Sequence, residues 1–334
     1  RLREEKGYHP KVIGITGSVG KTTAKEMVAS VLAQRWNTLK TEKNFNNQLG
    51  VPLTLFRLEP EHEAAVVEMG VSHFGDMAPL AAMVQPTAML FTIIGHAHLE
   101  FLRDRRGVLQ EKTSVLDTMP DDAVAFCNGD DDLLRAMTCR QRKVTFGLSE
   151  GCDVRAVDVR DLGDDGSTCT IVAGTRRIPV RIRAYGQHMV YAALEGAAVG
   201  IEYGLTDDEI IRGIAAYQPV GSRANVVRTA RYTVIDDCYN ANPDSTASLD
   251  PMPRRCTARP ASARPRRACR SSSRAERWRA RLRPVLPRRT RTCRRRRLPR
   301  STSCSRRCRS WCSRATACSS RRRTAWRLNA SFRR

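Results

Sequence analysis

The chain has 334 residues and a formal net charge of +24, with 58 Lys and Arg against 34 Asp and Glu. This average combines two unlike parts, because residues 1–250 carry a net charge of −5 whereas residues 251–334 carry +29. No apolar run approaches the roughly 18 residues of a membrane span, and no signal-peptide core is recognisable, so we expect no membrane insertion. The five cysteines of residues 1–250 show neither metal-ligand nor disulfide spacing, which predicts reduced thiols and a cytoplasmic protein.

The first predicted elements are a strand, a glycine loop and a helix. Residues 11–16, KVIGIT, form an apolar run closed by glycine, which predicts a buried strand. Apolar side chains at helical spacing from Thr22 to Trp36 predict a helix directly after the loop. The apolar runs 64–69 and 88–94 then predict two buried parallel strands.

The rest of the first 250 residues continues the alternation of strands and helices. A capping box at Thr206 and Glu209 predicts a helix that buries Ile210, Ile211 and Ile214. The other predicted elements are a helix over 78–84, a hairpin around Gly174 with strands over 168–172 and 178–182, a helix over 187–199 and a last strand over 232–236. This order predicts an α/β fold with a doubly wound, mostly parallel sheet and helices on both faces.

Residues 249–334 have a composition unlike that of a folded domain. Residues 251–334 contain 30 Arg, no Lys and one acid, Glu276, and they lack Gly, Asp and Ile. Such a segment buries too little apolar surface to offset its ordering entropy, and its like charges repel one another. A basic arm could bind nucleic acid or an anionic membrane surface, but seven cysteines and three tryptophans favour a shifted reading frame near Leu249. We therefore expect an unfolded Arg-rich tail and assign it no specific nucleic-acid partner.

Residues 17–23, GSVGKTT, lie between the first predicted strand and helix and suit a phosphate group. Glycines let backbone N–H groups approach phosphate oxygens, and the helix N-terminus adds the positive end of its dipole. Lys21 can reach the β- and γ-phosphates, and the Thr22 hydroxyl can bind Mg²⁺. Only the short G-x-x-G-K-T core matches, because Ile15 stands where the longer pattern has Gly. The loop predicts ATP or GTP binding through Gly17, Ser18, Val19, Gly20, Lys21, Thr22 and Thr23.

Four ordered segments together resemble the Mur ligases, the amide ligases that build the cell-wall peptide. These segments are the phosphate loop, residues 41–52 (TEKNFNNQLGVP), residues 67–70 (VEMG) with 92–99 (TIIGHAHL), and residues 235–245 (IDDCYNANPDS). The last segment resembles the branch of the family that adds D-alanyl-D-alanine to UDP-N-acetylmuramoyl-tripeptide. The resemblance covers about residues 11–248 and implies the family's central ATP-binding domain. Residues 1–10 would be the remnant of a linker from an absent N-terminal domain, and residues 249–334 stand where the C-terminal ligase domain should begin.

The resemblance implies a reaction and a set of partners. The γ-phosphoryl group of ATP would pass to the terminal carboxylate of the tripeptide, and the amine of D-alanyl-D-alanine would attack the resulting acyl phosphate. The implied cofactors are ATP and Mg²⁺, the implied substrates are UDP-N-acetylmuramoyl-tripeptide and D-alanyl-D-alanine, and a monomer is expected. Two alternatives remain open. One is another amide ligase of the superfamily, of the folyl-polyglutamate or cyanophycin type, and the other is a nucleotide-binding fragment without activity.

The resemblance also implies roles for individual residues. Glu68, at the carboxyl edge of the predicted sheet, would bind one Mg²⁺ together with Thr22, a role that suits a carboxylate and a hydroxyl. His98 resembles a ligand of a second Mg²⁺, and Lys112 matches a lysine that becomes carbamylated, so that its new oxygens bind that metal. From the residues alone, a lone histidine such as His98 is more often structural, and Lys112 is an ordinary lysine on a helix surface.

Further resemblances lie on the nucleotide side of the site. Arg223 would be a catalytic cation near the γ-phosphate. Asn128, Asp236, Tyr239 and Asn240 would lie near the nucleotide, although an Asn in a polar turn explains Asn128 equally well. His188 matches a Gly-x-His element of the family. The sequence departs from the family pattern at four positions, Ile93, Ser114, Met189 and Ala192.

Overall fold

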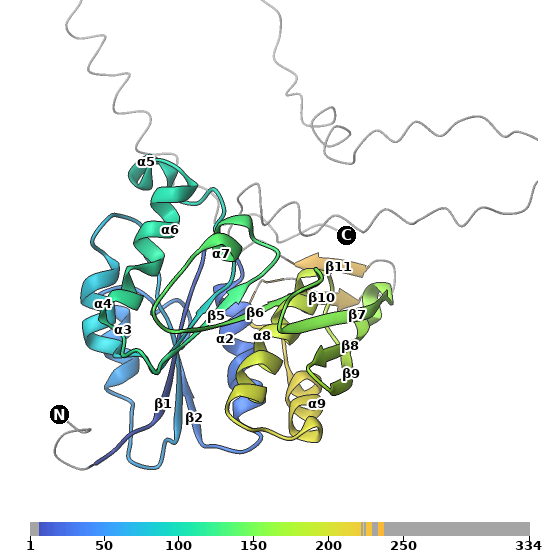
Figure 1. The fold of residues 1–334 in the computed structure, drawn as a ribbon. Coiled ribbons are helices and arrows are strands. Elements are labelled where there is room, and N and C mark those ends of the chain that lie inside the picture. The colour runs from blue at the N-terminus through green and yellow to red at the C-terminus, as the bar shows by residue number, and fades with distance from the viewer. Residues whose placement is uncertain (1–6, 222, 224, 229–232, 237–334) are drawn as a thin grey trace, which may run out of the picture. The chain divides into compact units, whose positions relative to one another are not determined.

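The computed structural model describes residues 7–221, 223, 225–228 and 233–236, coloured in Figure 1. The chain divides into two units, residues 1–257 and 258–334, and every described residue belongs to the first. The predicted Arg-rich tail over 249–334 lies outside the described residues. No helix in the described part is long and apolar enough to cross a membrane.

A nine-stranded sheet forms the centre of the described unit, with the strand order β2-β3-β1-β4-β5-β6-β7-β8-β9. All pairs from β2 to β7 are parallel, whereas β7, β8 and β9 pair antiparallel. The strands are β1 (Lys11–Thr16), β2 (Thr38–Lys40), β3 (Ala64–Glu68), β4 (Ala88–Phe91), β5 (Val124–Asn128), β6 (Arg142–Gly147), β7 (Val154–Asp161), β8 (Ser167–Ala173) and β9 (Arg176–Ile182). The predicted α/β class and mostly parallel sheet are therefore confirmed.

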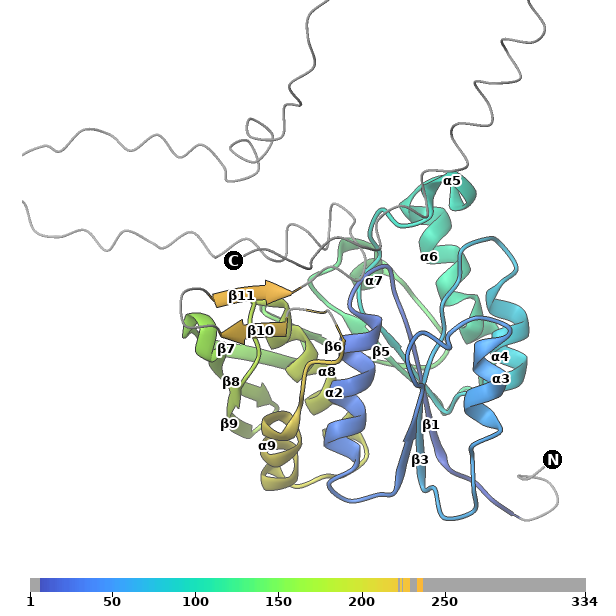
Figure 2. The same cartoon turned by 180° about the vertical axis from the view of Figure 1, so that it is seen from behind.

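Helices cover both faces of this sheet, as Figures 1 and 2 show from opposite sides. One apolar cluster joins strand residues to α2 (Lys21–Leu32), α8 (His188–Glu202) and α9 (Asp207–Ala216). The other face carries α3 (Gly50–Leu55), α4 (Met77–Val84), α6 (Arg105–Thr113), η1 (Ser114–Thr118) and α7 (Asp132–Ala136). The short α5 (Leu99–Leu102) precedes α6, and η2 (Gly163–Asp165) lies between β7 and β8. Alternate residues of the strands supply the two clusters, because successive side chains of a strand point to opposite faces.

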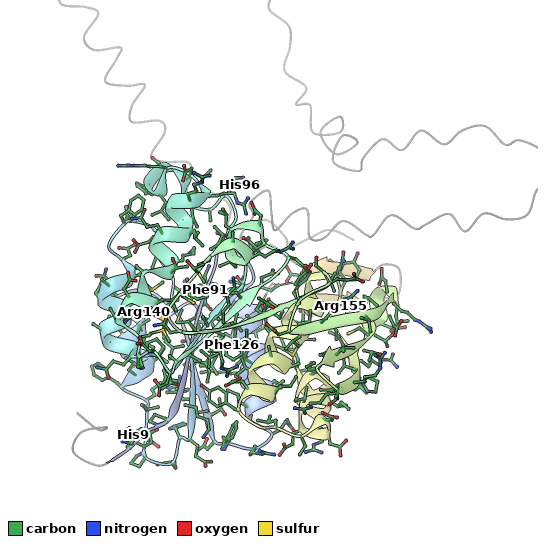
Figure 3. The ribbon with its side chains drawn as sticks, in the orientation of Figure 1. His9, Phe91, His96, Phe126, Arg140 and Arg155 are labelled. Carbon is green, nitrogen blue, oxygen red and sulfur yellow. The ribbon has the colours of Figure 1, made fainter. Side chains whose placement is uncertain are left out.

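The interior contains large apolar side chains from neighbouring parallel strands. Phe91 of β4 and Phe126 of β5 are fully buried, and in Figure 3 both lie in the middle of the unit while His9, Arg140 and Arg155 lie at its periphery. These strands are buried on both faces and read as nearly continuous apolar runs, as expected for a parallel sheet. This packing fixes the carboxyl edge of the sheet, where the phosphate loop lies.

Close packing between helices holds the phosphate-loop helix α2 against α8 and α9. A Cβ atom on Gly213 would lie 2.5 Å from the Cα of Val31, and one on Gly196 would lie 3.0 Å from the Val31 side chain. The Arg35 guanidinium, just after α2, donates to both carboxylate oxygens of Glu209, at 3.0 and 2.6 Å. Glu209 also completes the predicted capping box with Thr206, which is confirmed at the start of α9.

The structure differs from the predicted elements in several places, and it adds elements that were not predicted, among them β6 and β7. The first helix ends at Leu32 rather than at Trp36, because the chain turns through 33–36 before β2. The last strand, β11 (Thr233–Asp236), does not join the large sheet but pairs antiparallel with β10 (Asn225–Arg228), a strand that was not predicted. The short strand β2, which extends the edge of the main sheet, was also not predicted. The hairpin of β8 and β9 around Gly174 is confirmed.

Candidate functional site

The phosphate loop joins the end of β1 to the start of α2, as predicted. Gly17 has φ 152°, and a Cβ atom there would lie 1.9 Å from the Thr92 hydroxyl oxygen, so a side chain at this position would displace the residue that follows β4. Gly20 has φ 86° and occupies the N-cap position of α2, where a left-handed conformation favours glycine. The two glycines therefore set the loop's path and leave the N-terminus of α2 facing the carboxyl edge of the sheet.

Hydrogen bonds tie this loop to the segment that follows β4. The Ser18 N–H donates to the Ile93 carbonyl at 2.8 Å, and the Ser18 hydroxyl accepts from the Gly95 N–H at 2.9 Å. The Thr92 hydroxyl donates to the Val19 carbonyl at 2.6 Å. The segment that the loop holds continues from Gly95 to His98, the predicted second metal ligand, three residues later.

Lys21 is the first residue of α2, and its ammonium group donates to the Gly17 carbonyl at 2.8 Å. Burial lowers the pKa of Lys21, while the Glu68 carboxylate acts in the opposite direction and the Arg223 guanidinium adds to the lowering. Lys21 therefore lies close enough to Glu68 and Arg223 for their charges to shift its pKa. A cation held over the loop's own carbonyl is in place to exchange that contact for a phosphate oxygen.

The Thr22 hydroxyl and the Glu68 carboxylate form the other predicted pair of the site. Thr22 donates to one oxygen of Glu68 at 3.0 Å, and the Asn46 amide donates to the other at 2.7 Å. Glu68 ends β3 and is only 2% exposed. A buried carboxylate beside a hydroxyl at a sheet edge offers the oxygen ligands that Mg²⁺ prefers. Asn46 lies in the segment 41–52 that resembles the family, but its contact with Glu68 was not predicted.

Lys112 corrects one expectation from the sequence. Its residue type on a helix predicts an exposed side chain, but Lys112 lies on the inner face of α6 and is 1% exposed. Burial lowers the pKa of Lys112 to about 7, and the nearby charge of Lys21 contributes to the lowering, whereas Glu111 opposes it. A substantial fraction of the amine is therefore uncharged at neutral pH. The Glu111 carboxylate holds the start of α4 by accepting from the Gly75 and Met77 N–H groups.

His98 lies just before α5 with a left-handed backbone, φ 58° and ψ 30°, and its side chain is exposed. Partial burial lowers the pKa of His98, and the charges of Lys112 and Lys21 lower it further. His98 therefore lies close enough to Lys112 and Lys21 for their charges to lower its pKa. A lowered pKa keeps the imidazole neutral, which is the form that binds metals. No group of three or more His, Cys, Asp or Glu side chains suited to a metal occurs among the described residues.

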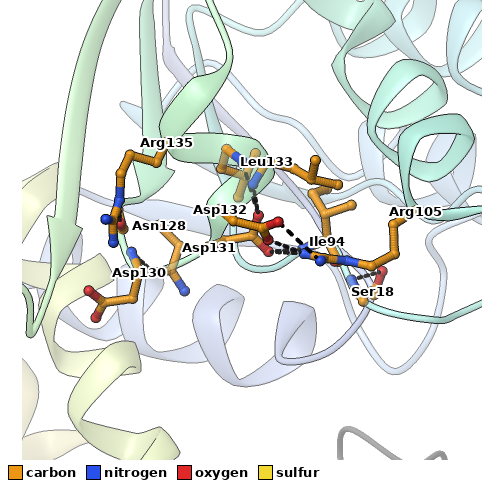
Figure 4. A network of polar contacts seen from close by, with 12 residues as sticks. Ser18, Ile94, Arg105, Asn128, Asp130, Asp131, Asp132, Leu133 and Arg135 are labelled. Carbon is orange, nitrogen blue, oxygen red and sulfur yellow. Dashed lines mark hydrogen bonds and ion pairs between the residues drawn. The ribbon is translucent and has the colours of Figure 1, made fainter.

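The other residues that the sequence predicted for the site lie at the ends of strands, at the start of a helix or outside the described residues. Asn128 ends β5, and its side-chain oxygen accepts from the Asp130 N–H at 2.9 Å, a turn contact that fits the structural interpretation of this residue (Figure 4). His188 is the first residue of α8. Asp236 ends β11, whereas Tyr239 and Asn240 lie outside the described residues.

Asp131 and Arg105 organise the same edge, and the sequence analysis missed both. The Asp131 carboxylate accepts from the Ile94 N–H at 2.8 Å and also caps α7 through the Leu133 and Leu134 N–H groups (Figure 4). Arg105 donates to the Ile94 carbonyl at 2.8 Å and pairs with Asp132 at 2.6 Å. The acidic run after β5 signals an N-cap, but nothing in the sequence shows that it reaches back to Ile94.

Together, a strand, a glycine loop, a helix that begins with a partly buried lysine, and a hydroxyl–carboxylate pair define a P-loop α/β nucleotide-binding domain. Residues 15–200 match the Mur ligase middle domain, more than half of the chain. The chain therefore belongs to the Mur ligase family.

Curated relatives agree with this assignment. The UDP-N-acetylmuramoyl-tripeptide–D-alanyl-D-alanine ligases of Bacillus subtilis and Escherichia coli K12 are each 34% identical to the chain, over 239 and 237 residues. Each alignment covers 70% of this chain but only 51% and 52% of the relative. The chain thus spans about half the length of the curated relatives that it matches.

Solved structures show the same likeness. The first crystal structure of MurF from Acinetobacter baumannii matches with a TM-score of 0.69 and 33% identity, covering 74% of this chain and 54% of that one. MurF from Thermotoga maritima in complex with ADP matches with a TM-score of 0.66 and 28% identity, covering 74% and 58%. A folylpolyglutamate synthase mutant from L. casei, at 17% identity and a TM-score of 0.55, shares the fold.

Proposed function

We propose that this chain is the nucleotide-binding part of an ATP-dependent ligase that joins D-alanyl-D-alanine to UDP-N-acetylmuramoyl-tripeptide. The observation that carries the proposal is the convergence of Lys21, the Thr22–Glu68 pair and Lys112 at the carboxyl edge of the parallel sheet. Ligands of open α/β sheets bind at this edge. The substrate assignment is supported by the names of the curated relatives and of the MurF structures.

The phosphate loop would bind the triphosphate of ATP. Its N–H groups and the start of α2 would face the phosphate oxygens, and Lys21 would leave the Gly17 carbonyl to contact them. Arg223, close enough to Lys21 to lower its pKa, would supply a second cation near the phosphoryl group in transfer. The MurF ligase from Thermotoga maritima was solved in complex with ADP, which supports nucleotide binding by this chain.

Two sets of residues would hold Mg²⁺. Thr22 and Glu68 already lie within 3.0 Å of each other and offer only oxygen atoms, so they fit a hard cation. His98 and Lys112 would form the second set. Lys112 would bind Mg²⁺ there only after a modification that adds oxygen atoms to its side chain. When bound, Mg²⁺ would neutralise charge on the phosphate oxygens.

Lys112 would acquire those oxygens by carbamylation. Its uncharged amine nitrogen, available because the pKa is about 7, would form a bond to the carbon of CO₂ and lose a proton, which leaves an N-carboxylate. The product is anionic, so the change would also remove the repulsion between Lys112 and Lys21.

The ligation itself would proceed in two steps. The terminal carboxylate of the tripeptide would attack the γ-phosphorus of ATP and release ADP. The amine of D-alanyl-D-alanine would then attack the acyl carbon, so that inorganic phosphate leaves, the amine loses a proton and the amide forms. The chain's contribution is positioning and charge stabilisation.

A second candidate is a nucleotide-binding fragment without ligase activity. It is favoured by the composition of residues 251–334, which carry 30 Arg and a single acid. The two candidates are separated by incubating the full chain with ATP, Mg²⁺, UDP-N-acetylmuramoyl-tripeptide and D-alanyl-D-alanine and detecting the pentapeptide product by mass spectrometry. The proposed ligase forms product only with both substrates. ATP binding without product would support the fragment, and turnover with folate and glutamate in their place would support a different ligase.

A further inference from the structure

Lys25, one helical turn after Lys21, is a buried cation outside the contacts described above. Its side chain is 1% exposed, and its ammonium group donates to the Thr41 carbonyl at 2.6 Å and pairs with Glu26 at 2.8 Å. Burial alone would raise the pKa of Glu26, but hydrogen bonds from Lys25 and Lys40 hold it below its ordinary value. A buried charge is retained in a fold only where its partners compensate for the lost hydration. The contacts of Lys25 therefore show what it stabilises.

Thr41, the residue that Lys25 holds, contacts the end of β3 on its other side. Its N–H donates to the Val66 carbonyl at 3.0 Å, and its hydroxyl accepts from the Glu68 N–H at 3.0 Å. Thr41 is fully buried, so its carbonyl needs a donor from the protein, and Lys25 supplies it. A continuous path thus runs from the Lys25 ammonium through Thr41 to the backbone of Glu68.

The segment that begins at Thr41 reaches Glu68 a second time through Asn46. The Asn46 amide donates to the Glu68 carboxylate at 2.7 Å, and the Asn46 carbonyl accepts from the Gly70 N–H at 2.7 Å. A Cβ atom on Gly70 would lie 2.8 Å from the Asn46 side chain, so this fit leaves little room for movement. The segment from Thr41 to Asn46 therefore fixes both the backbone and one oxygen of Glu68.

We propose that Lys25 is a positioning residue that, by anchoring the segment from Thr41 to Asn46, sets the orientation of the Glu68 carboxylate toward Mg²⁺. The inference rests on the proposed function, in which Glu68 and Thr22 hold that metal. Lys25 does not touch the metal or the nucleotide in this account. Its effect is on how much Mg²⁺ strengthens nucleotide binding.

The chain offers a matched control for this role. Lys40 pairs with the same Glu26 carboxylate as Lys25, but its side chain is 46% exposed and no hydrogen bond from it to Thr41 is present. Replacing either lysine with methionine removes one of the two cations that pair with Glu26 and keeps most of the side-chain length. Only Lys25→Met removes the donor to Thr41.

The experiment measures binding of a fluorescent ATP analogue to the full chain, once with Mg²⁺ and once with EDTA. The readout is the ratio of the two dissociation constants, which reports the metal's contribution separately from activity. We expect Lys25→Met to reduce this ratio at least fivefold, with the affinity in EDTA within twofold of the parent. Lys40→Met should keep the parental ratio. Thr41→Val, which removes the hydroxyl that accepts from Glu68, should reduce the ratio in the same direction.

Melting curves show whether each variant is folded, and if Lys25→Met is not, Thr41→Val decides the question. A parental ratio in Lys25→Met, or an equal loss of affinity with and without Mg²⁺, would overturn the inference. A parental ratio in a folded Thr41→Val would also overturn the inference if Lys25→Met does not fold.

Glu68→Gln separates the two proposals. If it abolishes the ratio while Lys25→Met does not change it, the metal site stands and the role of Lys25 falls. If Glu68→Gln keeps the parental ratio, the proposed metal site fails.

Discussion

The parallel and antiparallel ends of the sheet differ in the charges that they bury. At the carboxyl edge of β1 and β3, Lys25, Glu68 and Lys112 are each at most 2% exposed. In the hairpin, buried residues alternate with half-buried ones in β8 and mostly with exposed ones in β9, and the ion pair of Arg176 with Asp207 lies at the surface. Burying a charge costs free energy unless a partner or ligand compensates. The difference indicates that the parallel edge is shaped for a ligand, whereas the hairpin extends and stabilises the fold.

The largest expected effect is the loss of catalysis in Lys21→Ala. Charge-assisted contacts to a phosphoryl group in transfer contribute roughly 2.7–4 kcal/mol, so we expect product formation to fall at least about a hundredfold. The measurement is the initial rate of ATP-dependent ligation. Lys11→Ala is the control, because the Lys11 ammonium lies over the Trp36 ring at the opposite end of β1. A Lys21→Ala rate within a few-fold of the parent would remove the phosphate loop from the mechanism.

The second prediction concerns Lys112→Ala. If Lys112 carries a carbamate, its removal abolishes ligation, and short carboxylates such as acetate partly restore the rate by replacing the lost oxygens. In the parent protein, the activation of ligation by added bicarbonate should increase as pH rises through about 7, because only the uncharged Lys112 amine adds to CO₂. Arg106→Ala, an exposed position on the same helix, should behave as the parent. Near-normal activity of Lys112→Ala would contradict the carbamate.

Smaller effects are expected on stability, beginning with Glu195 on α8. It is 4% exposed, and burial raises its pKa well above the ordinary value. The protonated form is therefore favoured in the folded state, so stability is full below the unfolded-state pKa of about 4.3 and decreases as pH rises above it. Glu195→Gln should flatten this decrease and raise the melting temperature at pH 8. Denaturant unfolding at pH 5 and at pH 8 gives the change in the free energy of unfolding between the two pH values. An equal change in parent and variant would refute the assignment.

The smallest effect is expected at the antiparallel end, in Asp207→Ala. The Arg176 and Asp207 side chains are 29% and 47% exposed, and exposed ion pairs contribute about 0–1 kcal/mol. Nucleotide affinity should not change, and the free energy of unfolding should fall by less than about 1 kcal/mol. A large change in ATP affinity would show that the hairpin belongs to the site and would break the contrast between the two ends.

Local patterns predicted much of the fold. The glycine loop after β1 and the capping box at Thr206 are each set by neighbours within a few residues, and both are confirmed. The strand β2 was missed because three residues, Thr38–Lys40, are too short to show a period. The pairing of β11 with β10 was missed because a strand's partner is a long-range property that its own residues do not reveal.

The site was predictable where a motif joins residue type to position, as at Lys21, Thr22 and Glu68. The burial of Lys112 and Lys25 was not, because a lysine on a helix is usually exposed and only tertiary packing decides otherwise. Asn46 and Asp131 were missed for a related reason. Each makes its decisive contact with a residue more than 20 positions away, Glu68 and Ile94. Roles within the site that were assigned by resemblance, such as those of Tyr239 and Asn240, stay predictions.

Hydrogen–deuterium exchange of the full chain, with and without ATP and Mg²⁺, tests the central claim most directly. If the parallel edge is the nucleotide site, ATP slows exchange in the phosphate loop, residues 17–23, and in the segments 41–50 and 92–98 that are bonded to its surroundings. Exchange in β8 and β9 should be the same in both conditions. Protection of the hairpin without protection of the loop, or no protection at a saturating ATP concentration, would contradict the account.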